Sequence, residues 1–199
     1  MLSADPDADG RLTAAERELL AGVARRAVAA AARRRDEPTP EVPDGGRLSL
    51  AGASFVTLHR GRELRGCIGS IEPRRPLVHD VAANGRAAAL ADVRFAPVAV
   101  GELGALAIEL SVLGPRRPLV VASELELLAA LRPGVDGLIL ELGARRATFL
   151  PTVWEQLPDP REFVAQLRRK AGISASWSPS LRVARYEVEA FAAGSPLDD

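Results

Sequence analysis

The first hydrophobic pattern in the chain is helical and follows an acidic, polar lead-in. Thr13 and Glu16 have the spacing of a capping box, in which the two side chains satisfy free amides at a helix start. Apolar residues then recur near helical spacing up to about Arg34, which predicts a helix that docks on a core. A connector rich in proline and glycine, residues 38–46, cannot continue this helix.

The pattern then changes from helical to alternating. Residues 54–59 and 64–68 carry β-forming side chains on either side of a tight turn, which predicts a β-hairpin. Pro76 is placed to open a second helix, and the alanine-rich sequence after it sustains that helix to about Ala91. Residues 92–97 follow as a loop.

The second half of the chain mixes strands and helices. Residues 106–113 alternate and predict a half-buried strand with Glu109 and Ser111 on its polar face. The pattern further predicts a short helix from Ser123, strands at 137–142 and 147–150, a helix from Asp159 to Ala171, and a last strand at 183–191. Because these elements neither alternate as βαβ units nor separate fully, they indicate an α+β fold with a mostly antiparallel sheet and packed helices.

The composition indicates a globular protein but does not identify a binding partner. The chain has 199 residues, of which 47% are hydrophobic, as expected for one globular domain. Since 26 basic residues offset 26 acidic ones and aromatic residues make up only 4%, we do not expect nucleic-acid binding. No run approaches the roughly 18 apolar residues of a membrane-spanning helix. The acidic start lacks the features of a secretory signal, so we expect a cytoplasmic protein with no membrane association.

Cys67 is the only cysteine, and it lies between two glycines in Arg65-Gly66-Cys67-Ile68-Gly69. Glycine weakens a strand unless another backbone or a ligand approaches closely there. Two interpretations remain open at this point. In the first, the strand is bulged and Cys67 packs as a small hydrophobe. In the second, the charge of Arg65 favours a Cys67 thiolate that acts as a nucleophile.

A nucleophilic Cys67 would need a base, and the two histidines are His59 and His79. A hairpin loop of two or four residues places His59 and Cys67 on opposite faces of the sheet, and a three-residue loop leaves them about 13 Å apart. His79, at the start of the next helix, is interpreted as a surface residue. These spacings match no zinc or iron pattern, so we expect no metal site and no cofactor.

The lead-in carries one specific match to a metal site. Asp5, Asp7, Asp9, Gly10 and Glu16 fit the calcium-loop pattern D-x-D-x-D-G-x5-E. An EF-hand also needs a helix that enters the loop, and only a short segment precedes this one. Glu16 is moreover the acidic partner in the capping box. We therefore interpret the segment as an acidic extension rather than a calcium site.

Polar residues elsewhere each allow a structural and a functional interpretation. Asp92 and Arg94 lie in a loop, where they could form an ordered ion pair or where Arg94 could bind an anion. Glu109 and Ser111 could hydrogen-bond a polar ligand if their face of the sheet lines a cleft, and are ordinary surface residues if it faces water.

Several of these segments, in this order, resemble the AMMECR domain family. The resemblance runs from about Leu12 to Phe191, nearly the whole chain. The segments that carry it are 55–58, 64–69 (Leu-Arg-Gly-Cys-Ile-Gly), 92–95, 108–113, 147–151 with Trp154, and 170–172.

The resemblance implies a single AMMECR-type domain in two subdomains. The domain would occupy residues 12–192, between the acidic extension at 1–11 and a tail at 193–199. Residues 65–69 would border a cleft between the subdomains, with Cys67 as candidate nucleophile or ligand contact. The candidate substrate-binding residues are Arg65, Gly66, Gly69, Arg94, Glu109 and Ser111.

The resemblance also implies partners. Bacterial members of the family look like protein A of a three-part system, together with a Memo-like, dioxygenase-type protein and a radical S-adenosylmethionine enzyme. Such a system would modify a small molecule or nucleobase, and this chain would bind the substrate or join the partners. Two alternatives remain: a stand-alone enzyme that uses Cys67 as nucleophile, and a regulatory module that binds protein or RNA.

Overall fold

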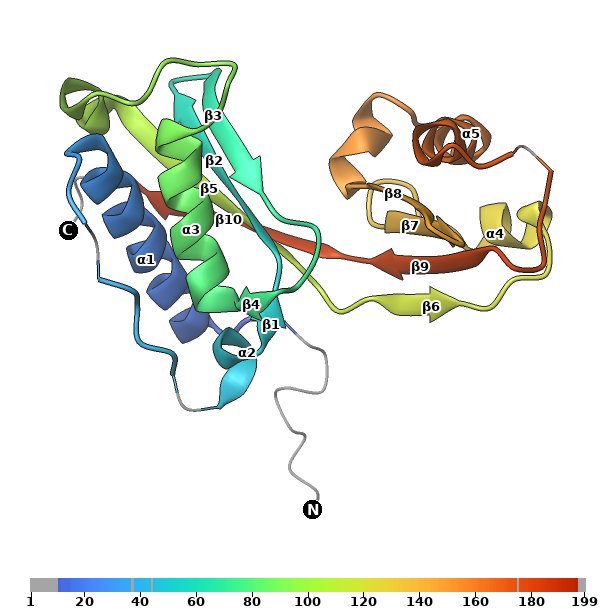
Figure 1. Ribbon diagram of the computed structural model, residues 1–199. Coiled ribbons are helices and arrows are strands. Elements are labelled where there is room, and N and C mark those ends of the chain that lie inside the picture. Colours follow the sequence, from blue (N-terminus) through green and yellow to red (C-terminus); the bar gives the residue numbers. More distant parts are fainter. Residues whose placement is uncertain (1–10, 37, 44, 175, 197–199) are drawn as a thin grey trace. The chain divides into compact units, whose positions relative to one another are not determined.

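The structure is a computed structural model that describes residues 11–36, 38–43, 45–174 and 176–196 (Figure 1). The chain divides into two compact units. Unit 1 comprises the residues up to Leu113 and those from Glu189 onwards, and unit 2 spans Gly114–Val188. The Asp5 to Gly10 part of the calcium pattern lies outside the described residues.

Unit 1 is a sheet with helices on one face (Figure 1). Its sheet has the strand order β10-β5-β2-β3, and the short strands β1 and β4 pair with each other. The helices α1 and α3 lie across one side of this sheet (Figure 1). The bounds are α1 (Ala14–Ala32), α2 (Gly46–Ser49), β1 (Ala51–Gly52), β2 (Ser54–Arg60), β3 (Glu63–Gly69), β4 (Arg75–Pro76), α3 (Leu77–Leu90), the 3-10 helix η2 (Val100–Ala105), β5 (Leu106–Leu113) and β10 (Val188–Gly194).

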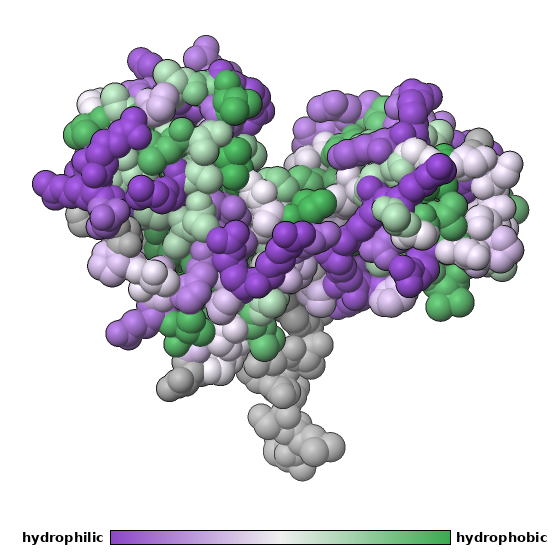
Figure 2. Space-filling model, in the orientation of Figure 1, coloured by the Kyte–Doolittle hydropathy of each residue, from purple (hydrophilic) through white to green (hydrophobic). Residues whose placement is uncertain are grey.

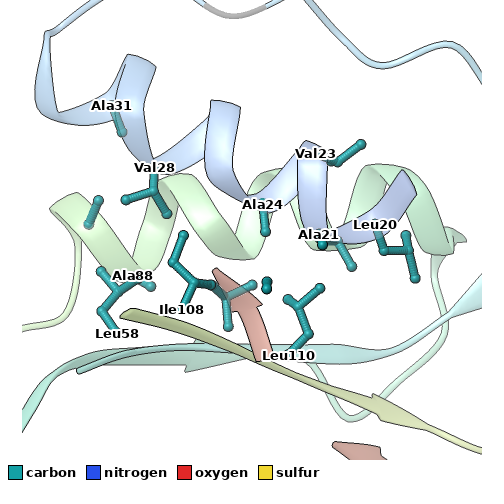
Figure 3. Close-up of a cluster of buried hydrophobic side chains, with 14 of the residues drawn as sticks. Leu20, Ala21, Val23, Ala24, Val28, Ala31, Leu58, Ala88, Ile108 and Leu110 are labelled. Carbon is teal, nitrogen blue, oxygen red and sulfur yellow. The ribbon is translucent and has the colours of Figure 1, made fainter. Parts of the chain in front are cut away.

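The core of unit 1 lies between the helices and the sheet. Leu58 of β2 and Ile108 and Leu110 of β5 are buried and point toward α1 and α3 (Figure 3). Each such aliphatic side chain stabilises the fold by about 1.5–3 kcal/mol relative to an exposed one. The predicted capping box is confirmed, since the Thr13 hydroxyl accepts from the Glu16 amide at 3.2 Å and the Glu16 carboxylate accepts from the Thr13 amide at 2.8 Å.

A buried carboxylate, Asp80, ties the sheet to α3. Its Oδ2 accepts hydrogen bonds from the Ser54 amide and hydroxyl at 2.9 and 2.8 Å, from the Ser70 hydroxyl at 2.8 Å and from the Asn84 amide at 2.9 Å. Its Oδ1 lies 3.3 Å from Nε of Arg75. A buried charge is stable only with such partners, so this network fixes the start of β2 and the end of β3 on the helix.

Unit 2 is a second antiparallel sheet, in the order β6-β9-β7-β8, with helices α4 and α5. Its core contains Trp154, whose ring stacks on Phe163 at 3.7 Å and whose Nε1 donates to the Asp136 carbonyl at 2.7 Å. The bounds are β6 (Arg117–Leu119), α4 (Glu124–Ala130), β7 (Gly137–Leu142), β8 (Arg145–Phe149), the 3-10 helix η3 (Pro151–Glu155), α5 (Pro160–Ala171) and β9 (Arg182–Tyr186).

The α+β class is confirmed, and the main helices and strands lie close to their predicted positions. The prediction of a single last strand at 183–191 was wrong. It is two strands, β9 and β10, that belong to different sheets and are separated at Glu187. Strand β10 extends to Gly194, and Ala193 is buried. Among the described residues, no helix is both long and apolar enough to cross a membrane.

Candidate functional site

The candidate site lies on the sheet face of unit 1 that points away from α1 and α3. Side chains alternate along β2, so Val56 and Leu58 are buried under the helices and Thr57 points to the other face. The register places Thr57 directly opposite Cys67 of β3 on one side and Glu109 of β5 on the other. Cys67, Thr57 and Glu109 therefore form one row across three adjacent strands.

Two neighbouring rows extend this face. One row contains Gly69, Phe55 and Ser111, and the other contains Leu64, His59 and Ala107. Glu109 is exposed, whereas Cys67, Thr57 and Ser111 are partly buried. Of the candidate residues taken from the sequence, Cys67, Glu109 and Ser111 thus share one face of one sheet.

Cys67 is held on three sides. Its thiol accepts a hydrogen bond from the Thr57 hydroxyl, with Oγ1 and Sγ 3.3 Å apart. Its amide donates to Oδ2 of Asp92 at 2.8 Å, and its carbonyl accepts from Nη2 of Arg94 at 3.3 Å. Since β3 is an edge strand, the amide and carbonyl of Cys67 point outward, and these two side chains satisfy them in place of another strand.

Asp92 and Arg94 form an ordered ion pair. The Asp92 carboxylate accepts from Nε of Arg94 at 2.9 Å and from Nη2 at 2.7 Å, and it is buried. These hydrogen bonds, helped by the one from the Cys67 amide, outweigh burial and hold the pKa of Asp92 well below its ordinary value. The same pair raises the pKa of Arg94, to which electrostatic attraction by Cys67 also contributes. The cation beside Cys67 is therefore Arg94.

Arg65 has a different partner from the one the sequence suggested. Its Nε and Nη2 donate to the two carboxylate oxygens of Glu102 in η2, at 2.8 and 2.9 Å. Arg65 lowers the pKa of Glu102 to about 2, mainly through these hydrogen bonds, with the Ala99 amide as a further donor. This bidentate pair joins β3 to the segment before β5. Arg65 therefore pairs with Glu102, and the arginine that donates to the Cys67 backbone is Arg94.

The two glycines beside Cys67 lie where neighbouring atoms leave no room for a side chain. A Cβ at Gly66 would lie 2.5 Å from the Ala88 carbonyl oxygen of α3, and one at Gly69 would lie 2.3 Å from the Phe55 ring. Close packing accounts for both glycines, and a contact of either with a ligand stays a prediction.

Strand β3 is bulged, as one of the two interpretations of this segment held, and the bulge corrects the position of His59. The register shifts between Leu58 and His59, so that Arg65 is the extra residue. The hairpin turn has two residues, for which the sequence argument placed His59 and Cys67 on opposite faces. That inference was wrong, because the one-residue register shift at the bulge turns Cys67 to the same face of the sheet as His59. The two residues are diagonal neighbours on one face, roughly 7–8 Å apart between Cα atoms.

His79 belongs to the opposite side of the sheet. It lies on α3, the helix that covers the buried face, and its Nε2 donates to the Pro40 carbonyl at 2.9 Å. Because Cys67 points away from α3, His79 and Cys67 are not in one site. Within the described residues, no three or more His, Cys, Asp or Glu side chains form a group that could hold a metal ion.

Thr57 belongs to this site, although its strand pattern alone does not mark it as a functional residue. Alternation along residues 54–59 places it on the polar face, but its importance depends on the register with both neighbouring strands. A strand pattern alone does not say which strands are neighbours.

The molecule is thus an α+β protein in two units whose bulged edge strand presents a cysteine on a polar sheet face. The chain belongs to the AMMECR1 family, whose sequence profile matches residues 21–191. A protein of Thermofilum pendens is 37% identical over 205 residues, which cover 96% of this chain and 95% of that protein. A protein of Methanothermobacter thermautotrophicus is 40% identical over 140 residues, 69% of this chain and 73% of that protein.

A solved structure supports the fold. The crystal structure of protein PH0010 from Pyrococcus horikoshii matches with a TM-score of 0.71 and 31% sequence identity. The match covers 88% of this chain and 90% of that one.

Proposed function

We propose that the row Cys67, Thr57 and Glu109 binds a small polar substrate, and that the chain is a substrate-binding component rather than the source of the chemistry. The spacing within the row supports this. Adjacent strands lie about 4.8 Å apart, so the backbones at Cys67 and Glu109, with β2 between them, are roughly 10 Å apart. That separation is long for direct proton transfer between the two side chains, but a small molecule can span it.

The chemistry of the row indicates what kind of ligand fits. Glu109 offers carboxylate oxygens to N–H or O–H donors, and Ser111 in the next row adds a hydroxyl. Thr57 can accept as well as donate, and the Cys67 sulfur offers a soft, polarisable contact. A nucleobase or another flat molecule with several N–H or O–H donors would match this set.

The proposed partners follow from the family resemblance. We propose that the chain is protein A of a three-part system, with a Memo-like protein and a radical S-adenosylmethionine enzyme. In this arrangement the partners supply the oxidative or radical step, and the chain presents the substrate to them. Membership in the AMMECR1 family supports the proposal.

Native mass spectrometry of the chain purified from its own cells tests the proposal. We expect a bound small molecule in the wild type, reduced in Glu109→Gln and Cys67→Ser and retained in Glu155→Gln, a change at an exposed glutamate of unit 2. Co-purification of a Memo-like protein or a radical enzyme would support the partner assignment. A ligand retained equally in all variants would place its site elsewhere.

A second candidate is covalent catalysis by Cys67. The observation that favours it is the placement of the Cys67 sulfur, which accepts a hydrogen bond from the Thr57 hydroxyl, in a residue whose carbonyl accepts from the Arg94 guanidinium. Cys67→Ser separates the two functions. A substrate-binding role predicts partial loss of binding, whereas nucleophilic catalysis predicts an adduct on the Cys67 peptide in the wild type and complete loss of activity in the variant.

A further inference from the structure

A groove on the helix side of unit 1 has a composition distinct from the site around Cys67. It has a volume of about 350 Å3, and it lies between α1, α3 and the connector that follows α1. Its basic side chains are Arg75, His79 and Arg86. Its apolar lining is formed by Ala27, Ala82 and Ala83, with Pro38 and Pro40 as a wall. We call it the α3 groove.

Two of the three basic side chains of the α3 groove share one face of the helix. His79 and Arg86 are seven positions apart, and Ala82 and Ala83 lie between them at the spacing of the same helical face. Arg75 lies just before the helix in β4. Two arginines and a histidine therefore line the same hollow as three alanines, whose small side chains leave room for it.

Each arginine of the groove is oriented by one contact that uses only some of its N–H donors. Arg75 contacts Asp80 through Nε at 3.3 Å, and 48% of its side chain remains exposed. Arg86 donates from Nη1 to the Arg35 carbonyl at 3.4 Å, and it is exposed. A guanidinium has five N–H donors, so these contacts orient the groups and leave further donors for a ligand. Over this side of unit 1, strongly hydrophilic side chains lie beside apolar ones (Figure 2).

The His79 ring is also oriented. Its Nε2 lies 2.9 Å from the Pro40 carbonyl oxygen, which can only accept, so Nε2 carries a proton. This contact fixes the imidazole against the connector at the edge of the groove. Its Nδ1 is then an acceptor in the neutral ring and a second donor in the charged ring.

We propose that the α3 groove binds a small phosphorylated ligand, with its phosphate between Arg75 and Arg86 and its apolar part on the alanine floor. Arginine is the side chain best suited to phosphate because its planar donors match two phosphate oxygens at once. The volume lies within the range of small-molecule sites and is large enough for a ring beside the phosphate. This site is separate from the row around Cys67 and does not depend on the function proposed for it.

The test uses phenyl phosphate as a probe, titrated into the full chain and followed by amide chemical shifts in NMR. We expect saturable shifts in α3, and binding weakened at least about tenfold in Arg86→Gln. The matched control is Arg74→Gln, which removes an exposed charge next to Arg75 and should bind as the wild type does. Ala83→Leu should fill the floor and remove the advantage of phenyl phosphate over inorganic phosphate.

Three results would overturn the proposal. One is the absence of saturable shifts in α3. Another is equal binding by the wild type and Arg86→Gln. The third is benzoate binding as tightly as phenyl phosphate, because this would show a general anion site with no preference for phosphate. Binding of the probe by Cys67→Ser should equal that of the wild type, which separates this test from the one on the sheet face.

Discussion

The Thr57 hydroxyl lies 3.3 Å from the Cys67 sulfur, across the boundary between β2 and the edge strand β3. This contact depends on the register of the hairpin, and the register depends on the bulge at Arg65. Without the extra residue, Cys67 would point into the helix-covered core. The bulge therefore presents the only cysteine of the chain on the polar face.

The contact predicts the reactivity of Cys67. Thr57→Val removes the hydroxyl that donates to the Cys67 sulfur while preserving the shape of the side chain, so alkylation by iodoacetamide should slow about fivefold. Thr57→Ser keeps the hydroxyl and is the matched control. Intact-mass spectrometry follows the reaction cleanly because the chain has only one cysteine. Equal rates in the wild type and Thr57→Val would show that the hydroxyl does not act on the sulfur.

Gly66 predicts a steric effect on stability. In Gly66→Ala the new methyl group would lie 2.5 Å from the Ala88 carbonyl oxygen, so β3 and α3 must move apart. We expect a loss of about 2–3 kcal/mol in the free energy of unfolding, measured by urea denaturation. Gly101→Ala is the matched control, since its Cβ would meet no atom within 4 Å. Similar stability of the two variants would contradict the close packing of Gly66.

Asp92 should be needed for the geometry at Cys67. Asp92→Asn keeps an oxygen for the Cys67 amide but removes the charge that holds Arg94. We expect a loss of about 1 kcal/mol in unfolding free energy, because the pair joins a buried carboxylate to an arginine whose side chain is 52% exposed. Cys67 alkylation should also change, whereas Asp159→Asn, at the exposed start of α5, should leave that rate as it is. An unaltered alkylation rate in Asp92→Asn would show that Asp92 is not needed for the geometry at Cys67.

The pair of Arg65 and Glu102 predicts a pH dependence of stability. The pKa of Glu102 is about 2 in the folded chain and 4.5 in its reference state, so the unfolded chain takes up the proton first as pH falls. The stabilisation is complete above pH 4.5 and is lost between pH 4.5 and 2, with a magnitude of up to about 3 kcal/mol. In urea denaturation at stepped pH, Glu102→Gln should lose less stability over this window than the wild type. Parallel pH profiles would contradict the role of the pair.

The elements that could be predicted from sequence are those with strong local signals. The capping box at Thr13 and the strict alternation of 106–113 each lie within one segment, and each was found at its predicted place. The split of the last strand was missed because β9 and β10 read as one alternating run. The break between β9 and β10 becomes visible only in the strand pairing, because each strand belongs to a different sheet.

The site was predictable in its residues but not in their relationships. Cys67, Arg94 and Glu109 were identified as polar or reactive groups in suggestive segments. Which cation lies beside Cys67 depends on the path of the loop after α3, and the sequence favoured Arg65 only because it is near in the chain. The row with Thr57 depends on β2 lying between β3 and β5, a long-range pairing that local periodicity does not encode.

The most direct test of the proposed binding site is protection of Cys67 from alkylation. The small-molecule fraction of extract from the native cells is added in increasing amounts to the wild type and to Glu109→Gln, and the iodoacetamide reaction is followed by mass. A substrate that spans the row should slow alkylation of the wild type in proportion to dose and should have little effect on Glu109→Gln. Equal protection of both proteins, or none of the wild type at any dose, would contradict the proposal that Cys67 and Glu109 bind one ligand.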